Sequence, residues 1–130
     1  MAGEQHTDLV DLPAGATAAM VADALDRMGH RDRVLDPAIR PVWPGARVAG
    51  RVVPVRVDAT DELPERPYDG EMSALDSLAP GDVPLYAVDP AARAAAWGEL
   101  FSCAARGRGA RGAVVDGFVR DAAQIEELRF

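Results

Sequence analysis

The chain has 130 residues, a length that suits one domain with a buried core and leaves no room for two. Acidic residues outnumber basic ones by 21 to 14, and the net charge of −7 disfavours non-specific binding to nucleic acid or to an anionic membrane. No apolar run approaches the roughly 18 residues that span a bilayer, and residues 1–11 lack the apolar core of a signal peptide. We therefore expect a soluble, cytoplasmic protein with no nucleic-acid or membrane partner.

The residues that usually bind soft metals are sparse. Cys103 is the only cysteine, so the chain can form neither an intrachain disulfide nor a zinc site built from thiolates. The two histidines, His6 and His30, lie far apart in the sequence. A bound metal would therefore be a hard cation held by oxygen atoms, such as Mg²⁺ or Mn²⁺.

The first half of the chain predicts a helix followed by an edge strand. Apolar residues recur at helical spacing over 16–28, with Thr17 as N-cap and Gly29 as the C-terminal stop. Residues 35–44 hold three prolines and an exposed Trp43, which predicts an extended connection. Residues 47–58 predict a strand with a break or bulge around 53–54, where Pro54 removes a hydrogen-bond donor.

The second half predicts alternating helices and strands. We expect a loop over 60–69, a helix over 70–78, a turn over 79–82 and a strand over 83–88. An alanine-rich helix over 91–105 follows Pro90 and ends before Gly107. A strand over 113–119 is interrupted at 116–117, and a final helix covers 122–128. This alternation predicts a layered α/β domain.

The glycine-rich run Gly-Arg-Gly-Ala-Arg-Gly at 107–112 has two alternative interpretations besides a turn. Its glycine spacing matches a dinucleotide-binding loop, but such a loop leaves a strand and opens a helix, whereas this run follows a helix and precedes a strand. Its arginines suggest RNA, but no aromatic residues lie between them. The order favours a helix C-cap and a tight turn.

Glu99, Arg120 and Asp121 are the candidate functional residues. Each has an ordinary interpretation alone: Glu99 and Arg120 as surface charges, and Asp121 as the N-cap of a capping box with Gln124. Together they suggest more, because a carboxylate at the end of a strand can bind a cation and an adjacent arginine can hold an anion or a developing enolate. A second carboxylate can orient a metal-bound water.

Cys103 and Trp97 lie close to Glu99 on the predicted helix, and each is better explained by packing than by ligand binding. Cys103 lies one turn further on, and a lone cysteine in an alanine-rich helix is more often a small core residue. Trp97 is better explained by packing than by stacking on a ligand.

Several segments together resemble the RraA-like family, which includes the regulator of ribonuclease E activity and the 4-hydroxy-4-methyl-2-oxoglutarate aldolases. Residues 17–29 resemble its opening helix, and Pro-Gly-Asp-Val at 80–83 and Trp-Gly-Glu-Leu at 97–100 resemble its next landmarks. Gly-Ala-Val-Val-Asp-Gly-Phe-Val-Arg-Asp at 112–121 resembles its most recognisable strand. An acidic residue, a gap of twenty residues and Arg-Asp form the motif of its metal-dependent pyruvate aldolases.

The chain departs from the family pattern in two places. Asp-Pro-Ala-Ala at 89–92 replaces a glycine-rich turn that lines the pocket in the family. Family members also continue for several dozen residues beyond Phe130. The resemblance therefore implies that the domain is truncated, without the C-terminal strands and without an acidic residue that reaches a neighbouring subunit's site.

The resemblance implies a fold, an assembly and a reaction. The fold is α/β, the swivelling ββα domain of the RraA-like type, over residues 1–130 with an N-terminal arm at 1–15, in a homotrimer. The reaction is that of a class II pyruvate aldolase, a lyase that cleaves small 2-keto acids with Mg²⁺ or Mn²⁺ and decarboxylates oxaloacetate as a side activity.

The resemblance also implies a role for each site residue. Asp121 holds the metal, Arg120 binds the keto oxygen and stabilises the enolate, and Glu99 orients a metal-bound water. Backbone N–H groups bind the substrate carboxylate, and they belong to Gly98, Glu99, Leu100 and Phe101.

Two other functions compete with the aldolase. The first is that of a non-enzymatic regulator that binds a ribonuclease; the chain could equally be an inactive, truncated homologue of the aldolases. The second is a methyltransferase of menaquinone synthesis, a function assigned to some such sequences, for which the chain has no glycine-rich cofactor loop in the right context.

Overall fold

The computed structural model describes residues 12–130. The predictions for residues 1–11, including the absence of a signal peptide, lie outside this range. The elements follow in the order α1 (Ala18–Arg27), β1 (Arg51–Val57), α2 (Asp69–Asp76), β2 (Asp82–Val88), α3 (Glu99–Gly107), β3 (Val114–Asp116) and α4 (Ala122–Leu128). The predicted alternation of helices and strands is confirmed.

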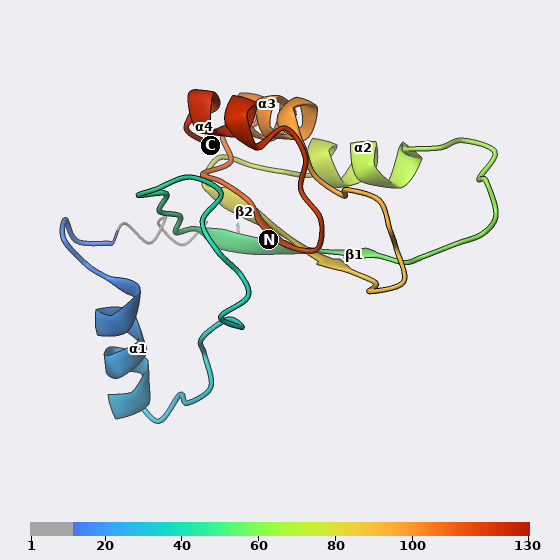
Figure 1. Cartoon of the computed structure of the whole chain (residues 1–130). Helices are drawn as coiled ribbons and strands as arrows, with labels where there is room; N and C mark the ends of the chain where they lie inside the picture. Colours follow the sequence, from blue (N-terminus) through green and yellow to red (C-terminus); the bar gives the residue numbers. More distant parts are fainter. Residues whose placement is uncertain (1–11) are drawn as a thin grey trace, which may run out of the picture.

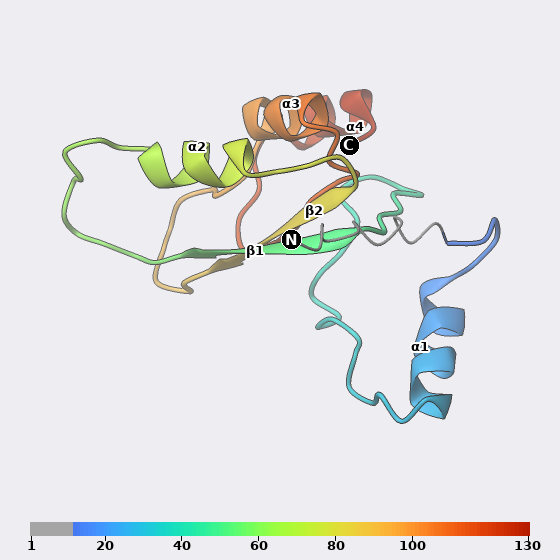
Figure 2. The same ribbon diagram turned by 180° about the vertical axis from the view of Figure 1, so that it is seen from behind.

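Three parallel strands form one sheet in the order β1-β2-β3. Parallel neighbours need a crossover connection, which α2 provides between β1 and β2, and α3 between β2 and β3. Helices α2, α3 and α4 lie together along one face of the sheet, as both ribbon views show (Figures 1 and 2). Residues 117–121 connect the carboxyl end of β3 to α4.

The core lies between this face of the sheet and the three helices. Tyr86 of β2 is fully buried, and the half-buried Val53, Val55 and Val115 of the neighbouring strands pack against the same cluster. The buried members of the cluster are Leu75, Leu78, Tyr86, Trp97, Ala105, Ala110 and Ile125. On the opposite face, Val52 of β1 is 54 % exposed.

Helix α1 stands apart from this layered body in both ribbon views (Figures 1 and 2). Its predicted ends are confirmed: the Thr17 hydroxyl accepts a hydrogen bond from the Met20 N–H at 3.2 Å, and Gly29 adopts a positive φ of 85°. None of its residues is buried. No helix among residues 12–130 is long and apolar enough to cross a membrane.

The connection from α1 to β1 is extended, as predicted, but Trp43 is not the exposed residue that we expected. Its side chain is half-buried against the core, and its indole N–H donates to the carbonyl of Phe130 at 3.3 Å. The Arg129 guanidinium lies 4.9 Å from the centre of the Trp43 ring, a cation–π contact. This contact joins the end of α4 to the connection before β1.

The predicted break or bulge in the first strand is wrong. Strand β1 runs without interruption through Pro54, which pairs in register with Leu85 of β2. Proline is tolerated here because β1 is an edge strand, so its missing N–H costs no hydrogen bond to a second neighbour.

The predicted helix over 91–105 is also wrong in its first half, because α3 begins only at Glu99. Alanine favours a helix over 91–96, but Trp97 instead forms a parallel bridge with Val119 and is buried in the core. The predicted strand over 113–119 is interrupted as expected, since β3 ends at Asp116 and pairing resumes only at that bridge.

An ion pair between the buried Asp82 and the largely exposed Arg51 joins β1 to β2 at their first residues. The Asp82 side chain is 1 % exposed and accepts hydrogen bonds from Arg51 Nε at 2.8 Å and Arg51 Nη2 at 3.0 Å. It also accepts from the Ala79 N–H at 2.9 Å. The carboxylate raises the pKa of the Arg51 guanidinium above its ordinary value, by hydrogen bonding and by its charge. The Pro-Gly-Asp turn therefore has a structural role at the amino end of the sheet.

Candidate functional site

Two segments distant in sequence meet beside β3. The Ala96 N–H donates to the Phe118 carbonyl at 3.0 Å, and the Arg120 N–H donates to the Trp97 carbonyl at 2.9 Å. Trp97 and Val119 form the parallel bridge between them. The residues that follow each segment are therefore held side by side.

The Trp97 side chain anchors this junction in the core. Its ring makes edge contacts with Tyr86 at 5.1 Å and Phe101 at 5.7 Å, and it stacks on Phe130 at 6.4 Å between centroids. Its indole N–H donates to the buried Ser102 hydroxyl at 2.9 Å. The prediction that Trp97 packs is confirmed, whereas its backbone pairing with Val119 was not predicted. The sequence signal for a non-helical conformation at this point is the Trp-Gly pair at 97–98, which ends the alanine-rich run before α3.

Asp121 brings the three candidate residues together. Its Oδ2 accepts a hydrogen bond from the Glu99 N–H at 3.1 Å, and its Oδ1 accepts one from Arg120 Nε at 3.3 Å. The capping-box interpretation is wrong: Asp121 holds the N-cap position of α4, but its side chain caps no N–H group of that helix. Its carboxylate instead caps α3, whose own N-cap residue, Gly98, has no side chain.

The backbone of Asp121 is unusual as well. Its φ of 59° and ψ of 38° are left-handed, a region that non-glycine residues occupy rarely and aspartate more often than most. Such conformations recur at functional sites, where surrounding contacts hold them. Here the hydrogen bonds to Glu99 and Arg120 supply those contacts.

The cluster is open to solvent on one side. The Arg120 side chain is 72 % exposed and the Asp121 side chain 30 %, while Glu99 is half-buried. The N-terminal end of α3 and the Arg120 guanidinium both donate hydrogen bonds to the Asp121 carboxylate. The arrangement therefore combines a carboxylate held by hydrogen bonds with an exposed cationic donor.

The start of α3 also offers backbone donors. The first N–H groups of a helix have no partner within the helix, and in α3 these include the N–H groups of Leu100 and Phe101. The Glu99 N–H already donates to Asp121, and the first intrahelical bond runs from the Ser102 N–H to the Gly98 carbonyl. Two of the four predicted substrate-binding residues, Leu100 and Phe101, thus have N–H groups directed along the α3 axis.

Comparison with known proteins identifies the family. The sequence profile of the RraA-like family, described as Aldolase/RraA, matches residues 18–130. The chain belongs to the RraA-like family. This family includes both aldolases and inhibitors of ribonuclease E.

Solved structures share the RraA-like fold of this chain. Streptomyces coelicolor RraAS2, described as an unusual member of the RNase ES inhibitor RraA protein family, has 23 % identity and a TM-score of 0.68, over 86 % of this chain and 54 % of its own. An uncharacterized protein from Pseudomonas syringae pv. tomato DC3000 has 24 % identity and a TM-score of 0.68, over 90 % of this chain and 50 % of its own. A protein described among novel cellulases from microbes associated with the gut ecosystem has 21 % identity and a TM-score of 0.80, over 88 % of this chain and 51 % of its own. The chain thus spans about half the length of these structures, and the likeness concerns the fold.

The donor set at Asp121 suits a divalent cation that keeps most of its water. Residues 12–130 contain no group of three or more His, Cys, Asp or Glu side chains that could hold a metal ion. Mg²⁺ is commonly bound through only one or two carboxylates plus water and substrate. Asp121 supplies one such carboxylate, which the backbone N–H of Glu99 holds in place.

The glycine-rich run of this RraA-like chain is a turn, as predicted. Arg108 caps the C-terminus of α3, and Gly109 follows with a φ of 83°. Its arginines contact neighbouring elements: Arg108 pairs with Asp76 of α2, and Arg111 donates to the Ala49 carbonyl.

Cys103 is exposed rather than buried, so the prediction that it belongs to the core is wrong. Helix α3 buries Ser102 and Ala105 instead.

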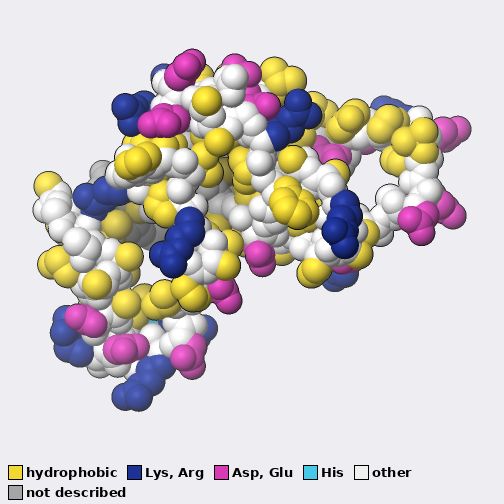
Figure 3. All heavy atoms as spheres, viewed as in Figure 1, with side chains coloured by type: hydrophobic (Ala, Val, Ile, Leu, Met, Phe, Trp, Pro, Cys, Tyr) yellow, Lys and Arg dark blue, Asp and Glu magenta, His cyan; other side chains and the backbone are white. Residues whose placement is uncertain are grey.

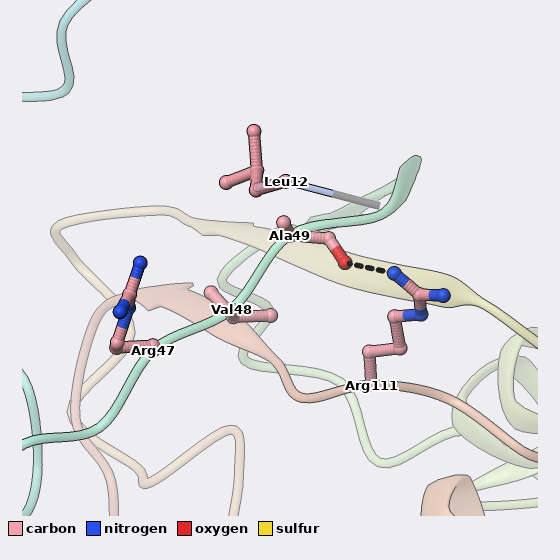
Figure 4. A pocket seen from close by; sticks show the side chains of 5 residues that line it. All are labelled: Leu12, Arg47, Val48, Ala49 and Arg111. Carbon is pink, nitrogen blue, oxygen red and sulfur yellow. Dashed lines mark hydrogen bonds between the residues drawn. The ribbon is translucent and has the colours of Figure 1, made fainter. Parts of the chain in front are cut away.

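A hollow lies at the other end of the sheet, before the first residues of β1 and β3. It is lined by Leu12, Arg47, Val48, Ala49 and Arg111. Figure 4 shows the Ala49 carbonyl directed toward the Arg111 guanidinium, to which it is hydrogen-bonded at 3.4 Å. Acidic and basic side chains are interspersed on the face shown in Figure 3. The residues that line this hollow do not include Glu99, Arg120 or Asp121.

Proposed function

We propose that this chain is a divalent-metal-dependent pyruvate aldolase that cleaves 2-keto acids of the 4-hydroxy-4-methyl-2-oxoglutarate type, with oxaloacetate decarboxylation as a side activity. One observation carries the proposal. Asp121 accepts hydrogen bonds from the Glu99 N–H at 3.1 Å and from Arg120 Nε at 3.3 Å, so residues 22 positions apart form one cluster. Family membership supports an aldolase activity, but it supports inhibition of ribonuclease E equally, because the family includes both kinds of protein.

The reaction requires stabilisation of an enolate. The C3–C4 bond of the substrate breaks, its electron pair moves to form the C2–C3 double bond, and the charge develops on the keto oxygen. The Arg120 guanidinium, largely exposed beside Asp121, would donate hydrogen bonds to that oxygen. Decarboxylation of oxaloacetate gives the same pyruvate enolate, which explains why one cluster would serve both reactions.

Substrate orientation would come from α3. The N–H groups of Leu100 and Phe101 and the positive end of the helix dipole would bind the substrate carboxylate next to the keto group. With the carboxylate bound there, the Arg120 side chain would be free to reach the keto oxygen. Arg120 immediately precedes Asp121, whose carboxylate caps α3.

Proton transfer would involve Glu99, and Asp121 would hold the cation. The Glu99 carboxylate would take the proton of the 4-hydroxyl group, through a water molecule, and return a proton to C3 of the enolate. A divalent cation, Mg²⁺ or Mn²⁺, supplies a Lewis acid for the developing negative charge when it is bound.

A coupled assay of pyruvate release tests this proposal. We expect activity with Mg²⁺ or Mn²⁺, its loss in EDTA and its return when the metal is restored. Arg120→Ala should lower kcat by about 10²–10³, the effect of removing one oxyanion donor. Arg27→Ala, on the separate helix α1, is the matched control and should leave kcat unchanged. A wild-type protein inactive with both metals, or a fully active Arg120→Ala variant, would contradict the aldolase assignment.

The second candidate is a non-catalytic regulator that binds a ribonuclease. RraAS2, with a similar fold, is described as belonging to a family of RNase ES inhibitors. Leu100 is 80 % exposed at the start of α3, and Phe118 is 60 % exposed on the adjoining segment, so apolar side chains are available for contact. Inhibition of a ribonuclease E-type enzyme by a protein that releases no pyruvate would favour this function.

We also propose the trimeric assembly that the family resemblance implies. Light scattering coupled to size exclusion would measure the mass in solution. A monomeric mass would argue against a site shared between subunits.

A further inference from the structure

Gly98 lies where α3 meets the Arg120–Asp121 pair, and its own backbone does not require glycine. Its φ of −164° and ψ of −165° describe an extended conformation that any residue adopts. The family resemblance implies a site role only for the Gly98 N–H group. Another property of glycine must therefore allow α3 and the Arg120–Asp121 pair to approach so closely at this position.

That property is the absence of a side chain. A Cβ atom at position 98 would lie 2.7 Å from Asp121 Oδ2 and 2.8 Å from Arg120 Cγ. Both distances are shorter than non-bonded contacts allow, and both atoms belong to short or inner parts of their side chains. A methyl group there would have to displace the carboxylate, the arginine or both.

The backbone cannot readily move to relieve this contact. Gly98 is buried, and the preceding Trp97 is fixed by its bridge to Val119 and by the hydrogen bond from the Arg120 N–H at 2.9 Å. The Gly98 carbonyl also accepts the first intrahelical bond of α3, from Ser102. The two segments are thus tied on both sides of the glycine.

We propose that Gly98 is a positioning residue for the reaction assigned above, on which this inference rests. The missing side chain creates the space in which the Asp121 carboxylate reaches the Glu99 N–H and the Arg120 side chain lies beside it. Gly98 acts through these two residues. Its Cα requires no chemistry of its own.

The test compares Gly98→Ala with Gly107→Ala. Gly107 is a matched control because it ends the same helix, has no positive φ, and a Cβ there would meet nothing within 4 Å. We expect Gly98→Ala to lower kcat for pyruvate release by about 100-fold, the scale of a displacement of about 1 Å in a catalytic group, with a smaller change in KM. Gly107→Ala should retain wild-type kcat.

A second measurement does not depend on activity. Hydrogen exchange of the Glu99 amide, followed by NMR, reports whether its N–H still donates to Asp121. We expect exchange at Glu99 to accelerate by about tenfold or more in Gly98→Ala and to stay unchanged in Gly107→Ala. If the wild-type protein releases no pyruvate, the proposed function fails, whereas the exchange comparison still tests the role of Gly98.

A double substitution covers the case in which Gly98→Ala is folded but too unstable for the activity assay. In an Asp121→Gly background, which keeps the left-handed backbone but removes the carboxylate, Gly98→Ala should lower the unfolding midpoint by less than half of its effect in the wild type. An equal effect in both backgrounds would overturn the proposal, as would a Gly98→Ala variant with wild-type kcat and wild-type Glu99 exchange.

Discussion

The buried Asp82 carboxylate offers the sharpest test of the fold, through the substitution Asp82→Asn. The carboxylate faces three donors, two from Arg51 and one from Ala79, at 2.8–3.0 Å. Asparagine keeps the volume but turns its own N–H₂ donors toward at least one of those N–H groups. Loss of a charged hydrogen bond and an unsatisfied buried donor each cost about 1–3 kcal/mol. Because solvent screens the 64 % exposed Arg51, we expect the lower part of their sum, a loss of about 2–4 kcal/mol in the free energy of unfolding.

Urea unfolding followed by circular dichroism measures this loss. With a slope of about 2 kcal/mol per M for a chain of this size, the midpoint should fall by about 1–2 M. Asp58→Asn is the matched control, because Asp58 accepts from Arg56 Nε at 2.6 Å while 62 % exposed, against 1 % for Asp82. We expect it to change the free energy by less than about 0.5 kcal/mol. Equal effects of the two substitutions would refute the reasoning that burial sets the energetic contribution of the Asp82 pair.

Three further predictions address the core, the turn after α3 and the lone thiol. The Tyr86 hydroxyl is buried and has no hydrogen-bond partner within residues 12–130, so Tyr86→Phe should leave stability unchanged or raise it by up to about 1 kcal/mol. Burial, and to a lesser extent the charge of Glu71, raises the Tyr86 pKa above its ordinary value, so stability should be constant below about pH 10 and fall above it. Tyr86→Phe should reduce that fall, as measured by urea unfolding between pH 8 and 11. If Tyr86→Phe lost more than about 1 kcal/mol of stability at neutral pH, the hydroxyl would have a hydrogen-bond partner after all. Gly109→Ala should destabilise the protein by about 1–2 kcal/mol in thermal unfolding, because φ is 83° and the new Cβ would lie 3.0 Å from Pro80 Cα in the turn before β2. Gly107→Ala should stabilise it slightly, because a Cβ there meets open space. A Gly107→Ala variant less stable than Gly109→Ala would contradict this account. Cys103 should react with a thiol reagent at the rate of an exposed cysteine without denaturant, and protection until unfolding would show that α3 is turned differently.

Local sequence signals predicted those parts of the fold that depend on local interactions. Helix α1 has the N-cap Thr17 and the stop Gly29 that its sequence indicates, and α4 has the predicted bounds 122–128. Turns at glycine and proline were equally readable, including the glycine-rich run after α3. In each case, neighbouring residues alone decide the conformation.

Tertiary contacts decided the features that the sequence did not predict. The alanines at 91–96 favour a helix, but burial of Trp97 and its pairing with Val119 outweigh propensities of a few tenths of a kcal/mol per residue. Because α3 then begins at Glu99, its buried positions are Ser102 and Ala105, and Cys103 faces solvent.

The sequence predicted which residues form the candidate site, but not the hydrogen bonds that connect them. Glu99, Arg120 and Asp121 were recognised by their spacing and by family resemblance, and the structure brings them into contact. A capping box at Asp121 was the natural local interpretation. Only the fold places α3 close enough to receive that carboxylate instead.

The cap that Asp121 provides to α3 has a consequence for the order of folding. A nine-residue helix is marginal alone, and this one receives its N-terminal acceptor from a residue 22 positions later in the chain. Its first turn cannot be stable until β3 has docked on β2 and the chain has turned into α4. We therefore expect the Glu99 end of α3 to be unstructured in the folding transition state, so that the cluster is assembled in the last step of folding.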